Sequence, residues 1–222
     1  RCYFPEIKVQ VMAALQTKTV VIIGGSSGIG FRVAQLAAQE GANLIIVGRN
    51  RERLTAARSE LSQMGVAVMT HEADVHNADA LEALFAALPP FNHLVSMVGD
   101  VMGGGFLNAP MATIRHVMES KFFTNVRIGQ LAATKLLPGG CLIYTSGTGG
   151  RAQDACASYV GNLGINALVE GLAVEMAPNV RVNAVSPTWT VTPFWRDMPA
   201  EQLEATRQRF AESIPLGRTA TI

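Results

Sequence analysis

A glycine-rich turn between an apolar stretch and an amphipathic one constrains this chain most. Residues 20–30 read VVIIGGSSGIG, so that a β-branched run leads into Gly24, Gly28 and Gly30. Glycine lets the backbone bend tightly and approach a bound group, and the helix that follows directs free N–H groups at it. A strand, a glycine turn and a helix in this order predict a site for the pyrophosphate of a dinucleotide.

Apolar runs and helix-period stretches alternate along the rest of the chain. Strands are expected at 19–23, 43–47, 66–70, 94–98, 141–145 and 181–185. Helices are expected at 28–39, 51–64, 78–87, 111–136, 157–176 and 200–212. Strands this apolar need cover on both faces, so the pattern predicts an α/β fold with a doubly wound, parallel, Rossmann-type sheet whose ligands bind beyond the carboxyl ends of the strands.

The length and composition fit one domain. The chain has 222 residues, of which 49% are hydrophobic, and a formal net charge of +1. No linker or repeat interrupts the alternation, so residues 12–222 are expected to form a single Rossmann-type domain. Residues 1–11 have no place in the pattern and are interpreted as an N-terminal arm or a cloning remnant.

Several classes of protein are disfavoured by composition. The sequence has no apolar run of membrane-spanning length and no secretory leader, and its charges nearly cancel without a basic cluster. The three cysteines and four histidines lack metal-ligand spacing. We therefore expect a soluble, cytoplasmic protein that has no bound metal and binds neither nucleic acid nor a membrane.

Taken together, the motifs resemble the short-chain dehydrogenase/reductase family. The likeness covers about 17–219 and rests on GGSSGIG at 24–30, EADV at 72–75, YTSG at 144–147, GLAVEMAP at 171–178, VRVNAVSP at 180–187 and VTPFW at 191–195. It implies an oxidoreductase that transfers hydride between a nicotinamide cofactor and a carbonyl or alcohol substrate. Family members usually extend further, which implies that a last strand is missing from the sheet.

The resemblance also implies which residues surround the cofactor. The turn residues Gly24, Ser26, Ser27, Gly28, Ile29 and Gly30 would hold the pyrophosphate. Asp74 and Val75 would lie beside the adenine, Gly99 near the nicotinamide ribose, and the segment from Pro187 to Thr192 around the carboxamide.

The residue after the second strand predicts the type of nicotinamide cofactor. A carboxylate there would accept hydrogen bonds from a ribose 2′-hydroxyl, whereas an arginine pairs with a 2′-phosphate. This chain has VGRN at 47–50, in which Gly48 leaves room and Arg49 supplies the charge. We expect NADP(H), with the alternative that Arg49 is only a solvated cation at the start of a helix.

The family's catalytic tyrosine and lysine match this chain poorly. Ser146 matches the family's serine, which polarises the substrate carbonyl. Counting thirteen residues forward from Ser146 puts the family's tyrosine position at Tyr159. Counting back from GLAVEMAP instead puts the tyrosine position at Ser158 and the lysine position at Asn162. Neither count finds a lysine, because Leu163 stands four residues after Tyr159. Whether the site turns over without this lysine is left open.

Another lysine aligns with the family's asparagine position. In VMESKFF at 117–123 this residue is Lys121, and we hypothesise that its ammonium lies near the cofactor ribose or the substrate. The alternative is a cation on the helix surface. Ser146, Tyr159 and Lys121 are thus the candidate catalytic residues.

Three functions remain open at this point. The first is an NADP(H)-dependent oxidoreductase acting on a small carbonyl or alcohol, and the second is a nucleotide-binding sensor or partner subunit of the same fold. A different Rossmann enzyme, such as a methyltransferase, is disfavoured because the later motifs match the dehydrogenases. The long apolar helices expected at 111–136 and 157–176 predict a homodimer or homotetramer.

Overall fold

The computed structural model describes residues 14–102, 105–148 and 156–222, so the predicted arm at 1–11 lies outside the described residues. Six parallel strands form one sheet in the order β3-β2-β1-β4-β5-β6. The strands are β1 (Thr19–Ile23), β2 (Asn43–Gly48), β3 (Val68–Glu72), β4 (Phe91–Ser96), β5 (Leu136–Thr145) and β6 (Arg181–Val185). This order is that of a Rossmann-type fold, which confirms the predicted class.

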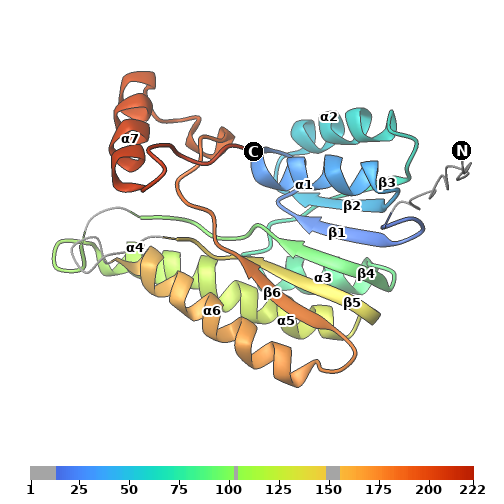
Figure 1. The fold of residues 1–222 in the computed structure, drawn as a ribbon. Coiled ribbons are helices and arrows are strands. Elements are labelled where there is room, and N and C mark those ends of the chain that lie inside the picture. Colours follow the sequence, from blue (N-terminus) through green and yellow to red (C-terminus); the bar gives the residue numbers. More distant parts are fainter. Residues whose placement is uncertain (1–13, 103–104, 149–155) are drawn as a thin grey trace, which may run out of the picture.

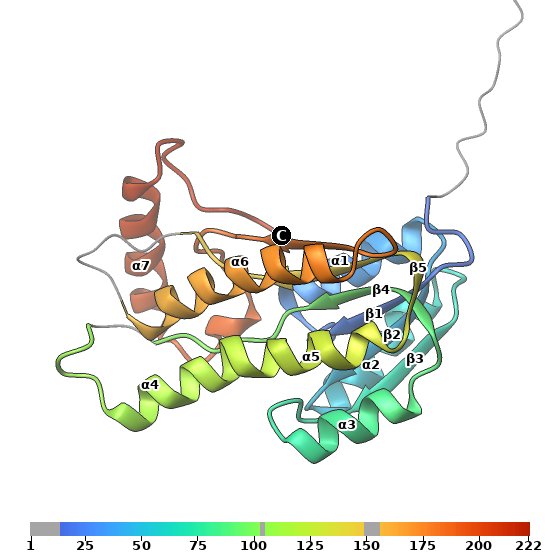
Figure 2. The same cartoon turned by 90° about the horizontal axis from the view of Figure 1, so that it is seen from below.

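Helices cover both faces of the sheet, as Figures 1 and 2 show. One face carries α1 (Gly28–Gln39) and α2 (Arg51–Ser62), and the other carries α3 (Ala78–Ala87), α4 (Met111–Met118), α5 (Thr124–Ala133) and α6 (Ala157–Glu175). The last helix, α7 (Ala200–Ser213), stands beyond the carboxyl ends of the strands, after a short 3₁₀ turn at Pro193–Trp195. Within the described ranges, none of the helices has the length and apolarity to cross a membrane.

Burial on two faces explains why the strands are so apolar. Along β1, Val21 and Ile23 join the core under α3, α5 and α6, whereas Val20 and Ile22 join the core under α1 and α2. Each such side chain contributes about 1.5–3 kcal/mol when it is removed from water. The central strand therefore holds both layers of helices on the sheet.

The largest difference from the expected elements concerns 111–136. The sequence predicts one helix there, and the chain is helical from Met111 to Ala133, three residues short of the predicted end. The segment divides into α4, a π-helical turn η1 (Glu119–Phe123) and α5, and β5 already begins at Leu136. Hydrogen bonding explains the early strand, because Leu136 pairs with Phe91 and the N–H of Gly139 donates to the carbonyl of Asn179 at 2.7 Å.

Two strands are displaced by a few residues from the predicted ranges. Apolar periodicity places the third strand at 66–70, but pairing of Leu44 with Val68 and of Gly48 with Glu72 fixes it two residues later. The fourth strand begins and ends earlier than predicted, since His93 pairs with Val20 in β1. Register in a parallel sheet is thus set by the neighbouring strand, which a single run of residues does not reveal.

Candidate active site

The glycine turn between β1 and α1 is packed so closely that there is no room for a Cβ at Gly24, Gly25 or Gly30. Gly24 donates its N–H to the carbonyl of Val47 at 2.8 Å and has a φ of +84°. A Cβ on residue 30 would lie 2.3 Å from the carbonyl oxygen of Gly24, so α1 can start here only with glycine. In the part of the chain that the structure describes, the Ser27 side chain makes no capping hydrogen bond to α1. The first N–H groups of the helix are therefore left without a side-chain cap and are available as donors.

Positive charge gathers at the carboxyl end of the neighbouring strand β2. A Cβ on residue 48 would lie 3.2 Å from the Ser26 hydroxyl oxygen, so the turn and the end of β2 are in close contact. Arg49 follows at once and is exposed, and the first turn of α2 carries the exposed Arg51 and Arg53 with the acidic Glu52 between them. The N-terminus is the positive end of the helix dipole, and the arginines add to its positive potential. This corner of the sheet therefore attracts an anion.

The segment after β3 borders the same corner. The carbonyl of Gly48 accepts a hydrogen bond from the N–H of Ala73 at 3.0 Å, and Asp74 is exposed next to it. The Asp74 carboxylate accepts a hydrogen bond from the N–H of His76 at 3.2 Å. Val75 instead packs into the core with 7% of its surface exposed.

The loop after β6 reaches back to the glycine turn. A Cβ on residue 28 would lie 3.5 Å from the Cβ of Thr192, and the Thr192 hydroxyl accepts a hydrogen bond from the N–H of Phe194. At the start of the loop, the carbonyl of Pro187 accepts from the N–H of Thr148 at 3.0 Å. The structure thus brings the predicted cofactor residues of β1, β2, β3 and β6 to one edge of the sheet.

Ser146 lies at the carboxyl end of β5 against α6. It is 5% exposed, and its hydroxyl donates to the backbone carbonyl of Asn162 at 3.1 Å. The Asn162 amide lies beside Gly147, where a Cβ would come within 2.7 Å of its nitrogen. Among the described residues, the buried Asn162 Oδ1 has no hydrogen-bond partner. A buried acceptor without a partner is the kind of group that a bound water or ligand can satisfy.

The face of α6 that meets β5 carries Ser158 and Asn162, which are four residues apart. The Ser158 hydroxyl accepts a hydrogen bond from the N–H of Met102 at 2.7 Å. Tyr159 stands one residue further and is half-buried, and Leu163, four residues after it, is 49% exposed. This geometry agrees with the count that assigns the tyrosine and lysine positions to Ser158 and Asn162, and a catalytic role for Tyr159 remains a prediction.

Lys121 lies inside the π-helical turn η1 and is only 6% exposed, so it is not a surface cation. Its side chain runs between two glycines. A Cβ on residue 161 would lie 3.0 Å from both Cβ and Cδ of Lys121, and a Cβ on residue 99 would lie 3.3 Å from its Nζ. Burial lowers the pKa of Lys121, while the electrostatic interaction with Asp100 acts in the opposite direction. Ser146 and Lys121 thus contact neighbouring residues of α6.

A buried asparagine that the sequence reasoning missed supports this turn. The Asn125 amide donates to the carbonyls of Val98 at 3.1 Å and Lys121 at 2.7 Å, and its oxygen accepts from the Ser96 hydroxyl at 2.6 Å. It therefore ties η1 to the end of β4. A single asparagine in an amphipathic helix is normally predicted to lie on the surface, so the sequence did not indicate that Asn125 is buried.

An aromatic cluster holds α7 against the loop after β6. The rings of Trp189 and Phe210 stack at 5.6 Å with an interplanar angle of 2°, and Trp195 lies 5.5 Å from Trp189. The Trp195 indole donates to the carbonyl of Thr190 at 3.0 Å. These contacts fix α7 on the loop that follows β6.

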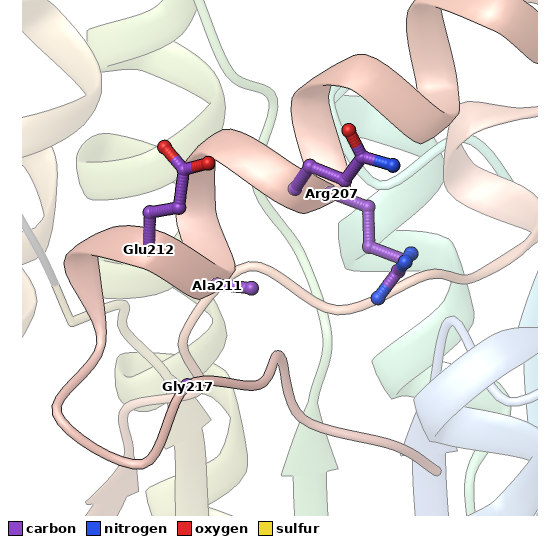
Figure 3. A pocket seen from close by; sticks show the side chains of 5 residues that line it. Arg207, Ala211, Glu212 and Gly217 are labelled. Atoms are coloured by element: carbon purple, nitrogen blue, oxygen red, sulfur yellow. The ribbon is translucent and has the colours of Figure 1, made fainter.

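The hollow shown in Figure 3 lies elsewhere, between α7 and the segment that follows it. Its volume is about 340 Å³, and its lining includes Arg207, Glu212 and Gly217. None of the predicted site residues lines it, so it does not belong to the candidate site.

Comparisons with known proteins agree with this arrangement. Residues 24–222 match the family model described as Enoyl-(Acyl carrier protein) reductase. The short-chain dehydrogenase/reductase malC of Malbranchea aurantiaca is 32% identical, over 93% of this chain and 84% of its own length. The 3-oxoacyl-[acyl-carrier-protein] reductase of Rattus norvegicus is also 32% identical, over 90% of this chain and 84% of its own.

Solved structures resemble the chain equally well. The MalC reductase/Diels-Alderase of Malbranchea aurantiaca superposes with a TM-score of 0.81 and 29% identity, covering 93% of this chain and 86% of that one. A dehydrogenase/reductase of Sinorhizobium meliloti 1021 also gives 0.81, with 27% identity over 95% and 85% of the two chains. The chain is a member of the short-chain dehydrogenase/reductase family of oxidoreductases, whose members bind a nicotinamide cofactor.

Proposed function

We propose that this protein is an NADP(H)-dependent reductase of a small carbonyl compound. The observation that carries the choice of cofactor is the exposed Arg49 at the end of β2, next to Gly48 and followed by Arg51 and Arg53. A guanidinium there pairs with a 2′-phosphate in two parallel hydrogen bonds. The uncapped N–H groups at the start of α1, together with Ser26, Ser27 and Ile29, would hold the pyrophosphate.

Ser146 and Lys121 are the proposed catalytic residues. Bound NADPH would supply the hydride, and negative charge would then grow on the substrate oxygen. Ser146 can donate a hydrogen bond to that oxygen once its hydroxyl turns away from the Asn162 carbonyl, and Lys121 can stabilise its charge. Both side chains meet α6 at Gly161 and Asn162, which supports a shared role at one reacting centre.

A sensor or partner subunit without turnover is the second candidate. One feature favours it: on the count back from GLAVEMAP, Asn162 takes the place of the family's lysine and Ser158 that of its tyrosine. A phenol that lacks an adjacent lysine can donate a proton but is a poor base. The active form is therefore expected to favour reduction over oxidation.

Two measurements on one preparation separate these candidates. Calorimetry with NADPH and NADH tests the cofactor, and NADPH consumption tests turnover. The relatives suggest a panel of a 3-oxoacyl thioester, L-sorbose and a 3-ketosteroid, since their names include a 3-oxoacyl reductase, a sorbose reductase and a 3β-hydroxysteroid dehydrogenase. Binding with consumption supports the reductase, whereas binding without consumption of NADPH by any compound supports the sensor.

We further propose that the protein is a cytoplasmic homodimer or homotetramer. Val160, Leu163 and Val174 on α6 are exposed, and such large apolar side chains on one helix suit a subunit contact. Cys141 and Cys156 are buried and unpaired thiols, in keeping with a reducing compartment. Light scattering at micromolar concentration tests the assembly, and a monomer would contradict it.

A further inference from the structure

Lys121 lies between two walls that come from different parts of the chain. The first wall is the segment 98–102 after β4, where a Cβ on residue 99 would lie 2.9 Å from Cγ and 3.3 Å from Nζ of Lys121. The second wall is α6, where a Cβ on residue 161 would lie 3.0 Å from Cβ and Cδ of the same lysine. The position of this side chain therefore depends on both walls.

The first wall is fastened to the helices α4 and α5 and to the turn η1 between them. The buried amide of Asn125 donates to the carbonyl of Val98 at 3.1 Å. The N–H of Asp100 donates to the hydroxyl of Ser120, which is 1% exposed, at 2.8 Å. Asp100 Oδ2 also lies 2.8 Å from Nε2 of His116 in α4. These contacts fix the residues on either side of the glycine, and none of them reaches α6.

Ser158 links the first wall to the second. Its hydroxyl accepts a hydrogen bond from the N–H of Met102 at 2.7 Å and lies 3.4 Å from the Met102 carbonyl oxygen, to which it can donate. The thiol of Cys156, which directly precedes α6, donates to the same carbonyl at 3.4 Å. The shortest of these bonds is one that Ser158 accepts, so it persists whichever way the hydroxyl hydrogen points.

We propose that Ser158 is a positioning residue, whose hydroxyl ties the two walls together and so keeps Lys121 at the reacting centre. This inference rests on the proposed function, in which Lys121 meets the substrate oxygen. On the count back from GLAVEMAP, Ser158 stands at the position of the family's tyrosine. In this chain the position thus serves to hold a lysine from another helix, and not to donate a proton.

Two measurements on the ligand-free protein test the tie without turnover. Amide hydrogen exchange, followed by NMR, reports whether the N–H of Met102 keeps its partner, and we expect Ser158→Ala to speed up this exchange about tenfold. Nitrogen NMR of labelled lysine follows the titration of Lys121. Burial is the main cause that lowers the pKa of Lys121, so Ser158→Ala should raise this pKa towards its ordinary value as the first wall comes away from α6.

Two further variants serve as controls. Ser158→Thr keeps a hydroxyl and should restore slow exchange and the wild-type titration. Asn166→Ala changes an exposed residue of the same helix and should behave as the wild type. Exchange of the Met102 N–H that Ser158→Ala leaves unchanged would overturn the tie. Faster exchange with an unchanged titration of Lys121 would overturn its effect on the lysine.

Turnover separates this inference from the proposed function. With whichever panel compound the wild type reduces, we expect Ser158→Ala to lower kcat about tenfold at unchanged KM for NADPH, and Ser158→Thr to recover it. An unchanged kcat would overturn the positioning role and leave the proposed function intact. If the wild type consumes no NADPH with any compound, the proposed function fails and the catalytic role of Ser158 fails with it, while hydrogen exchange still decides the contact with Met102.

Discussion

The side chain of Lys121 lies directly against the Cα of Gly161, because a Cβ on residue 161 would approach two of its carbons to 3.0 Å. A lysine from η1 thus occupies the space that a larger residue on α6 would fill. This contact brings a cation to the carboxyl ends of the strands from a different helix than the one that carries the family's lysine.

Enlarging residue 161 should displace Lys121. We expect Gly161→Ala to lower turnover about tenfold, while NADPH affinity stays the same, since the new methyl group forces the lysine to shift. Gly171→Ala is the matched control, because it lies in the same helix with nothing within 4 Å of an added Cβ. The control should raise stability by about 0.4–1 kcal/mol and keep full activity. Equal turnover in both variants would refute the contact's role.

Stability should depend on pH through Lys121. Burial lowers the pKa of Lys121 in the folded state below its ordinary value of 10.5. At pH values between the folded-state and unfolded-state pKa of Lys121, the unfolded state binds more protons than the folded state. The free energy of unfolding therefore rises with pH as the penalty for the buried charge disappears. Lys121→Met, which has no charge, should be more stable than the wild type near pH 7, by a margin that shrinks towards pH 10. Urea denaturation at both pH values measures it, and a margin independent of pH would argue against a buried ammonium.

Cofactor preference should depend on Arg49. Arg49→Ala is expected to weaken NADPH binding about tenfold or more and to leave NADH binding unchanged, because a charge-assisted pair with the 2′-phosphate is lost. Arg58→Ala, an exposed arginine further along α2, serves as the control. Calorimetry with both cofactors decides the matter, and equal affinity of the wild type for NADPH and NADH would disprove the assignment.

The glycine turn should not tolerate a methyl group. In Gly30→Ala the new Cβ would meet the carbonyl oxygen of Gly24 at 2.3 Å, so the turn must open. We expect a loss of about 1–3 kcal/mol in stability together with loss of measurable NADPH binding. Thermal unfolding and calorimetry check the two effects, and a variant that binds NADPH normally would show that the turn does not hold the cofactor.

Periodicity and glycine spacing were sufficient to predict the parallel sheet and the strand-turn-helix unit at 24–30. The assignment of Ser146 came from the family resemblance, and that of Arg49 from the chemistry of a 2′-phosphate. The π-helical turn around Lys121 was not predictable from periodicity. Apolar spacing continues through 111–136, and the π-helical turn is fixed by long-range hydrogen bonds of Asn125 to β4. Asp100 and His116 lie sixteen residues apart, and only the fold brings them together.

The proposed roles of Ser146 and Lys121 in carbonyl reduction are tested by NADPH consumption with the carbonyl panel, measured side by side for the wild type, Ser146→Ala and Lys121→Met. We expect the wild type to oxidise NADPH with at least one compound and each variant to do so about tenfold more slowly or worse, while calorimetry shows that all three bind NADPH alike. Equal rates in the three proteins, or NADPH binding by the wild type with no consumption by any compound, would contradict these roles.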